Sequence, residues 1–213
     1  MVVPPNLLVF SHSSILDGCI YDDEDVKRVK FAYNQGHMVA SHTWAHKDLT
    51  TLSSEDINSE MSRVEDALDR IIGVRPAFTR PPYGNYNDLV RKVAKARGQK
   101  LVTWDFDSGD STGSTPAQSK AAYDKVAKQH PSTILALNHE TYGAYIDYIF
   151  DLLSQILIVE STAHIVIPYA IKLLKAKGYK LVTLAECLSM DPYQSVSTPK
   201  AVNFARLRCR LSY

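Results

Sequence analysis

Apolar side chains recur along this chain at two spacings, one helical and one extended. The clearest helical stripe consists of Ile57, Met61, Val64, Leu68 and Ile71. Its i, i+4, i+7, i+11, i+14 spacing predicts one long amphipathic helix. Serines before the stripe and a glycine after it are the usual cap residues. We therefore predict a helix that begins at Ser53 or Ser54 and stops at Gly73.

The same patterns predict a regular alternation of helices and strands. Further helices are predicted at residues 22–33, 87–96, 116–129 and 162–176, with a short helical turn at residues 185–188. Short apolar runs predict strands at residues 37–40, 77–79, 100–106, 133–137 and 179–184. Asp22 or Asp23 can cap the first helix. Strands that alternate with helices in this way indicate an α/β architecture with a parallel sheet.

Composition fits one soluble globular domain. The chain has 213 residues, of which 45% are hydrophobic and 22% charged, and that length suits a single domain. The formal net charge of +1 does not suggest a nucleic acid or an anionic membrane as partner. No stretch is long enough to be a transmembrane helix. Residues 1–12 lack a basic region and a clear cleavage site, so they make a poor signal peptide. We expect a monomer.

Three cysteines, Cys19, Cys187 and Cys209, are too few for a disulfide framework. Their odd number allows one bridge and one free thiol. The cysteine content alone therefore does not decide the redox compartment.

Two histidines four residues apart, His42 and His46, are the first candidate for chemistry. On a helical turn, positions i and i+4 share one face. Two imidazoles placed in this way can bind one divalent metal, and zinc or a neighbouring transition metal suits them. An isolated pair of this kind is more often two surface histidines near a helix start. The metal interpretation depends on the segments that follow.

Three further segments place polar side chains just after predicted strands. They are Arg-Pro-Pro-Tyr-Gly at residues 80–84, Trp-Asp-Phe-Asp-Ser-Gly-Asp at residues 104–110, and Leu-Asn-His at residues 137–139. Barrels and open α/β sheets carry their chemistry at these strand ends. In order and spacing, the histidine pair and these segments resemble the polysaccharide deacetylases with NodB homology, carbohydrate esterase family four. The local sequence most resembles fungal chitin deacetylases.

The resemblance implies a fold and a reaction. The fold would be a distorted and incomplete (β/α) barrel at residues 18–194, and the reaction would be metal-dependent removal of N-acetyl groups from chitin or a related N-acetylglucosamine polymer. His42 and His46 would bind Zn²⁺ or Co²⁺, which polarises the acetyl carbonyl and activates a water. The backbone N–H of Tyr83 would bind the oxyanion, and Arg80 would orient the base. The alternative for this segment is a plain rigid loop.

The resemblance also assigns the second half of the site. His139 would be the general acid that protonates the leaving amine, and Asp110 would hold that imidazole. Trp104 and Leu137 would form apolar walls of the substrate groove. Ordinary core packing is the alternative for Trp104 and Leu137, and a structural role is the alternative for His139.

The family's first motif, an Asp-Asp pair on the first strand, has no counterpart in this sequence. Asp22 and Asp23 open a helix, so capping explains them better. Without the pair, the general base and the third metal ligand are absent. We therefore expect weak or no catalysis. A non-catalytic carbohydrate-binding relic and a chain that does not fold stably are the competing hypotheses. Residues 1–17 match no family segment, which suggests a start that is too late, through truncation or a mistaken start codon.

Two later segments also depart from the family. Residues 143–159 interrupt a run that otherwise reads as the family does, and we interpret them as a translated intron. A helical insertion over the groove is the alternative, since apolar residues there could form a stripe. The tail at residues 195–213 matches nothing in the family, and its basic end could be a frameshift. By resemblance, the protein would be extracellular or in the cell wall.

Overall fold

The structure is a computed structural model that describes residues 8–11, 19–139, 162–200 and 209. The chain forms two compact units. The first comprises Met1–Thr103 with Val182–Tyr213, and the second comprises Trp104–Leu181. The unmatched insert at residues 143–159 lies outside the described residues. The hypothesis of a translated intron therefore stays a prediction.

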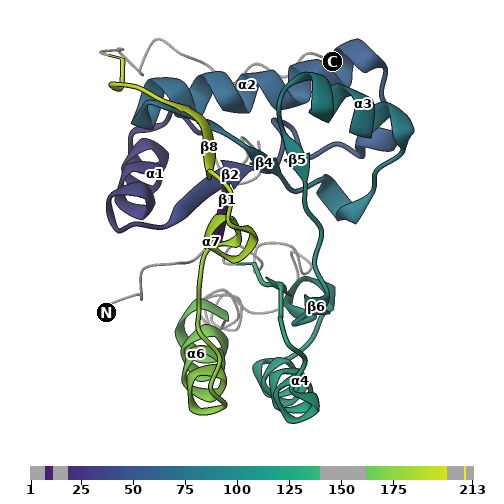
Figure 1. Ribbon diagram of the computed structural model, residues 1–213, viewed down its shortest axis with the longest axis vertical. Coiled ribbons are helices and arrows are strands. Elements are labelled where there is room, and N and C mark those ends of the chain that lie inside the picture. Colours follow the sequence, from purple (N-terminus) through teal and green to yellow (C-terminus); the bar gives the residue numbers. More distant parts are fainter. Residues whose placement is uncertain (1–7, 12–18, 140–161, 201–208, 210–213) are drawn as a thin grey trace, which may run out of the picture. The chain divides into compact units, whose positions relative to one another are not determined.

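A parallel sheet forms the centre of the first unit (Figure 1). Its four strands follow the order β1-β2-β4-β5. They are β1 (Leu8–Ser11), β2 (Met38–Ser41), β4 (Phe78–Thr79) and β5 (Lys100–Leu101). Every neighbouring pair is parallel. The α/β class and the parallel sheet expected from the sequence are confirmed.

Strand β1 was not predicted from the sequence. It pairs with β2 along its whole length, from Leu8 opposite Met38 to Ser11 opposite Ser41. A strand of four residues with prolines before it shows no clear alternation, so its periodicity could not reveal it. Its pairing covers the edge of β2 that would otherwise be open.

Three helices accompany this sheet: α1 (Asp23–Asn34), α2 (Ser54–Ile72) and α3 (Asp88–Ala96). The predicted stripe of α2 is fully buried. The Ser53 hydroxyl accepts the N–H of Asp56 at its start, and Gly73 ends it with φ of 74°. The helix bounds predicted from stripe and caps are confirmed, because both signals are local.

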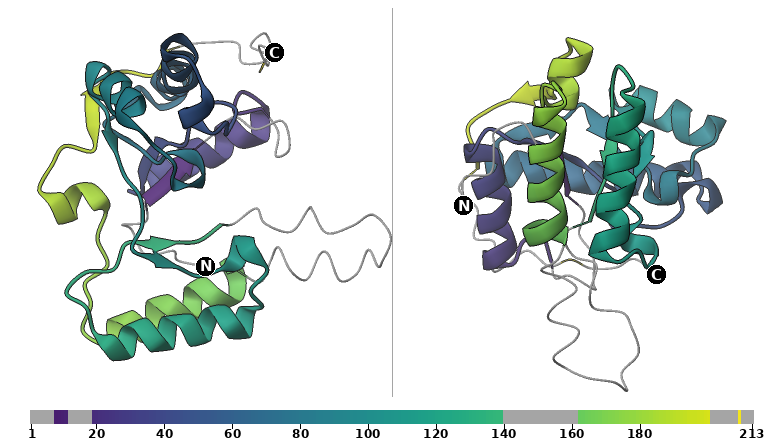
Figure 2. Two further views of the ribbon diagram at one scale, coloured as in Figure 1. Left: turned by 90° about the vertical axis from the view of Figure 1, so that its right-hand side faces the viewer. Right: turned by 90° about the horizontal axis from the view of Figure 1, so that it is seen from below.

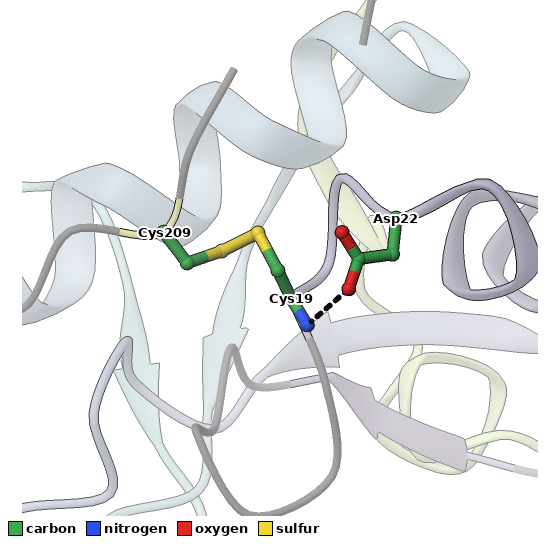
Figure 3. The surroundings of a disulfide bond; sticks show 3 residues. All are labelled: Cys19, Asp22 and Cys209. Atoms are coloured by element: carbon green, nitrogen blue, oxygen red, sulfur yellow. Dashed lines mark hydrogen bonds between the residues drawn. A yellow bond between two sulfur atoms is a disulfide. The ribbon is translucent and has the colours of Figure 1, made fainter. Parts of the chain in front are cut away.

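The start of α1 differs in detail from the prediction. Asp22 occupies the N-cap position, but its carboxylate accepts no helix N–H. It accepts the backbone N–H of Cys19 at 3.0 Å instead. Cys19 forms a disulfide with Cys209 across a separation of 190 residues (Figure 3). Of the arrangements that the cysteines allowed, the structure has one bridge and one exposed free thiol, Cys187.

Part of the unmatched tail region belongs to the first unit. Strand β8 (Tyr193–Val196) pairs antiparallel with β3 (Val74–Pro76). Beyond it, the Lys200 ammonium lies 2.5 Å from the Asp69 carboxylate. This contact, with a smaller contribution from Ser197, lowers the pKa of Asp69. Sheet pairing, an ion pair and the disulfide therefore connect residues 193–209 to the same unit.

The second unit combines a small sheet with two helices. Strands β6 (Phe106–Asp107) and β7 (Ala136–Leu137) are parallel. Helices α4 (Pro116–Gln129) and α6 (Ile167–Ala176) run side by side (Figure 2). A π-helical turn, Thr162–Val166, leads into α6. Their shared core consists of Tyr123, Ala127, Val166, Ala170 and Leu174.

Two predicted strands differ from the structure. The strand predicted at residues 100–106 is two separate strands, β5 and β6, which belong to different units. The strand predicted at residues 179–184 is absent, and Thr183 caps the short helix α7 (Leu184–Leu188). Tyr179 instead stacks on His130 and donates its hydroxyl to the Pro131 carbonyl at 2.6 Å. Side-chain contacts thus replace strand pairing there.

The described strands form three separate sheets, and these do not close into a barrel. This agrees with the incomplete barrel expected from the resemblance. No helix within the described ranges has both the length and the apolar character needed to cross a membrane.

Candidate functional site

Each predicted site segment follows the carboxyl end of a strand. His42 comes directly after β2, and Arg80 comes directly after β4. Asp110 follows β6 by a short loop, and His139 follows β7. The first two belong to the first unit and the last two to the second. Strand ends thus carry all the candidate chemistry, as the sequence predicts.

His42 and His46 face each other within the first unit. Their Nε2 atoms lie 3.1 Å apart, and their rings meet edge to face. The predicted helical turn is wrong: residues 42–46 form a loop in which Thr43 and His46 have φ of 70° and 52°. These left-handed conformations are uncommon for residues other than glycine. The loop, and not a helix face, brings the two imidazoles together.

The orientation of His42 suits a metal ligand. Its Nδ1 lies 2.7 Å from the carbonyl oxygen of Arg80. A carbonyl can only accept, so Nδ1 carries the proton and Nε2 of the neutral ring keeps its lone pair. Histidines that bind metals usually have such a partner on the other nitrogen. The Arg80 N–H donates to the Ser41 carbonyl at 2.9 Å, which fixes the carbonyl that holds His42.

The two histidines fit a divalent metal as a two-ligand site. Both Nε2 atoms converge on one point, and imidazole nitrogens are suitable ligands for zinc. Within the described part of the chain, however, no three His, Cys, Asp or Glu side chains gather closely enough to hold a metal ion. Among the described residues, His42 and His46 are therefore the candidate ligands, and their role as metal ligands stays a prediction.

The Arg-Pro-Pro-Tyr-Gly segment forms a tight turn beside the histidines. Tyr83 has φ of 59°, and the residue is 64% exposed. Its ring lies edge-on to the His46 ring, with centroids 4.9 Å apart. Gly84 and Asn85 donate their N–H groups back to the carbonyls of Pro81 and Pro82. The turn thus places Tyr83 at the candidate metal site.

Asp48 connects this turn to the histidine loop, a role that the sequence analysis missed. Its carboxylate accepts from the Thr50 backbone and hydroxyl and from the Asn85 side-chain amide at 2.8 Å. The Thr50 hydroxyl contributes most to the lowered pKa of Asp48, followed by the Thr50 backbone and Asn85. An Asp two residues before a Thr is a local turn signal, but its partner Asn85 is distant in sequence.

In the second unit, His139 is held by Asp110. The His139 backbone N–H donates to one carboxylate oxygen at 2.6 Å, and the ring Nδ1 lies 2.9 Å from the other. The Asp110 side chain is only 3% exposed, whereas the imidazole is 21% exposed. The pair therefore has the geometry of an imidazole oriented by a buried carboxylate, with Nε2 directed away from the carboxylate.

A buried tyrosine supports the residue before His139. The Tyr123 hydroxyl is hydrogen-bonded to the side-chain amide of Asn138. Burial raises the pKa of Tyr123 to about 12, since the charged phenolate is disfavoured there. The sequence analysis missed this contact, because Tyr123 reads only as an apolar position of a helix.

The two predicted groove walls differ in exposure. Leu137 is 5% exposed and lies in β7 opposite Asp107. Trp104 is half-buried at the start of the second unit. Burial of Leu137 is compatible with core packing as well as with an apolar wall. The substrate-binding roles of both residues stay predictions.

Comparisons with known proteins agree with this fold. A family described as "Polysaccharide deacetylase" matches residues 18–102. A chitin deacetylase from Pestalotiopsis sp. is 29% identical over 171 residues, which cover 80% of this chain and 51% of that protein. Chitin deacetylase from Colletotrichum lindemuthianum is 32% identical over 162 residues, which cover 74% of this chain and 58% of that protein. The chain belongs to the polysaccharide deacetylase family.

A solved structure extends the likeness to three dimensions. The chitin deacetylase of C. lindemuthianum superposes with a TM-score of 0.72 at 24% identity, covering 91% of this chain and 80% of that chain. The likeness confirms the fold. The chain spans only about half the length of the curated relatives that it matches. Its match to the polysaccharide deacetylase family covers the histidine loop and the Arg-Pro-Pro-Tyr-Gly turn.

Proposed function

We propose that this protein is a metal-binding deacetylase of N-acetylated polysaccharides, with chitin or a related N-acetylglucosamine polymer as substrate. The observation that carries the proposal is the His42–His46 pair, with its Nε2 atoms 3.1 Å apart and His42 oriented by the Arg80 carbonyl. Chitin deacetylases among the relatives support the choice of substrate. Zn²⁺ or Co²⁺ is the expected metal.

In the proposed reaction, each candidate site residue has a separate role. When bound at His42 and His46, the metal would polarise the acetyl carbonyl and lower the pKa of a water. The Tyr83 backbone N–H would donate to the oxyanion that develops on that carbonyl. His139, oriented by Asp110 at 2.9 Å, would protonate the departing amine. Arg80 would position a base, and Trp104 and Leu137 would enclose the acetyl methyl.

We expect this polypeptide to hydrolyse its substrate weakly or not at all. The described residues supply neither a third metal ligand nor an assigned general base. A metal ion with two protein ligands leaves more coordination sites to water than one with three, and the protein binds it less tightly. The same observation favours a second candidate function, a non-catalytic module that binds carbohydrate through Tyr83 and its neighbours.

Acetate release from chitin oligosaccharides with added zinc or cobalt tests the proposal. We expect a slow, metal-dependent rate that is lost in His139→Ala. No release together with retained oligosaccharide binding in His139→Ala would favour the carbohydrate-binding module. Robust turnover, comparable to a full-length chitin deacetylase assayed in parallel, would contradict the expectation of weak catalysis.

We further propose that the protein is secreted or located in the cell wall. The Cys19–Cys209 disulfide supports this location, because disulfides persist mainly in oxidising compartments. Chitin, the proposed substrate, would be met in the same place.

A further inference from the structure

One carboxylate of α2 reaches the loop that carries the candidate metal ligands. Glu60 is only 7% exposed, although it is charged. Its Oε2 accepts the backbone N–H of Trp44 at 3.0 Å and that of Ala45 at 2.7 Å. These two residues lie between His42 and His46. A single oxygen therefore holds the middle of the histidine loop.

The loop needs such a contact because two of its residues have backbone conformations that are energetically unfavourable by themselves. Thr43 and His46 both have positive φ, a conformation that persists when surrounding contacts impose it. The N–H groups of Trp44 and Ala45 are both satisfied by Glu60 Oε2, and leaving buried donors unpaired is costly. Hydrogen bonds to a charged acceptor are stronger than those between neutral groups. Glu60 thus holds the loop backbone between the two histidines whose Nε2 atoms face each other.

A second contact from α2 holds the same segment. The Arg63 guanidinium lies over the Trp44 ring, 4.0 Å from its centroid. Trp44 is 2% exposed and packs near the Tyr21 ring. Arg63 follows Glu60 by three residues, so both side chains leave the same face of α2. Helix α2 therefore contacts the loop in two ways: Glu60 binds the loop backbone, and Arg63 packs on the Trp44 ring.

We propose that Glu60 is a positioning residue for the metal site, which sets the loop conformation that lets His42 and His46 converge. This inference rests on the proposed metal-binding function. Glu60 would not touch the metal. It would act through the Trp44 and Ala45 amides, as an outer partner whose loss typically costs about 10–100-fold in metal affinity.

Zinc and cobalt affinities of the full chain, measured by isothermal titration calorimetry, test the proposal. We expect Glu60→Ala to weaken binding about 10–100-fold. Glu60→Gln should weaken binding less than Glu60→Ala, because its amide oxygen can accept both N–H groups although the charge that strengthens these hydrogen bonds is lost. Glu60→Asp keeps the charge but shortens the side chain, so it should weaken binding as well. Glu55→Ala, which removes an exposed carboxylate from the same helix, should change nothing.

Amide hydrogen exchange without metal separates this proposal from the proposed function. Glu60→Ala and Glu60→Asp should accelerate exchange at Trp44 and Ala45, Glu60→Gln should accelerate it less, and Glu55→Ala should not change it. If the wild type binds no metal while these amides respond as expected, the metal site fails and the positioning of the loop by Glu60 stands. Affinity and exchange that are unchanged in Glu60→Asp, or in a folded Glu60→Ala, would overturn the proposal.

Discussion

The two units each carry a histidine site, and the two sites differ in what faces the imidazole. In the first unit, His42 and His46 face each other, and a backbone carbonyl holds the outer nitrogen of His42. In the second unit, His139 faces the nearly buried carboxylate of Asp110. Neutral imidazoles that converge suit a metal cation, whereas an imidazole beside a carboxylate suits proton transfer. The partners of the imidazole thus differ between the two sites, and the roles proposed for the two sites differ accordingly.

The difference also shows how each site is stabilised. The histidine loop of the first unit is strained and relies on contacts from α2 and from the Arg80 turn. His139 instead lies two residues after the end of β7, and both its backbone N–H and its ring Nδ1 bind one carboxylate. Metal binding should therefore respond to changes outside the ligands, while the second site should depend mainly on Asp110 and the core beneath it.

The largest expected effect is on metal affinity. His42→Ala or His46→Ala removes one of two ligands, so zinc affinity should fall by more than about a hundredfold, beyond the loss typical of outer partners. His139→Ala should leave zinc affinity unchanged, and His164→Ala, at an exposed position, serves as the matched control. Calorimetric titration checks this. Equal losses of zinc affinity in His42→Ala and His139→Ala would contradict the assignment of metal binding to the first site alone.

The next effect concerns the first unit, which the disulfide closes. Cys19→Ser should lower the free energy of unfolding by about 3–5 kcal/mol, because a cross-link over a long loop restricts the unfolded chain. Cys187→Ser, which removes the exposed free thiol, should be nearly neutral. Thermal unfolding followed by circular dichroism measures both variants. Stability that is equal in Cys19→Ser and the wild type would show that the bridge contributes nothing.

The smallest expected effect is on stability at alkaline pH, and it concerns Tyr123, which is hydrogen-bonded to the residue before His139. The pKa of Tyr123 is raised from 10.0 to about 12, so the folded protein keeps a proton that the unfolded chain loses above pH 10. Stability from this group is complete below pH 10 and is lost as pH rises towards 12, by roughly 2–3 kcal/mol.

Tyr123→Phe should reduce the fall in stability between pH 10 and 12, measured by denaturant titration at each pH. Tyr86→Phe offers a control at an exposed tyrosine. If the free energy of unfolding falls equally between pH 10 and 12 in Tyr123→Phe and in the wild type, groups other than Tyr123 cause that fall.

Local signals predicted much of the fold. The α2 helix was predicted with its serine cap and terminal glycine, and the strand ends carry the polar segments as expected. The short strands β1, β3 and β8 have too few residues for a periodic pattern, so only pairing with distant strands defines them. The incorrect strand at residues 179–184 has the same origin, because an apolar run does not specify whether its partner is a strand or a side chain.

The sequence by itself determined the family, the alternation of helices and strands, and the position of the candidate histidines after strand ends, because these depend on residue type and local spacing. Only the tertiary structure decided how the histidines meet. The loop of His42 and His46 takes its shape from Glu60 and Arg80, and Cys19 pairs with Cys209 across 190 residues. Such contacts join residues far apart in the chain, and packing selects them from many partners of the same chemical type.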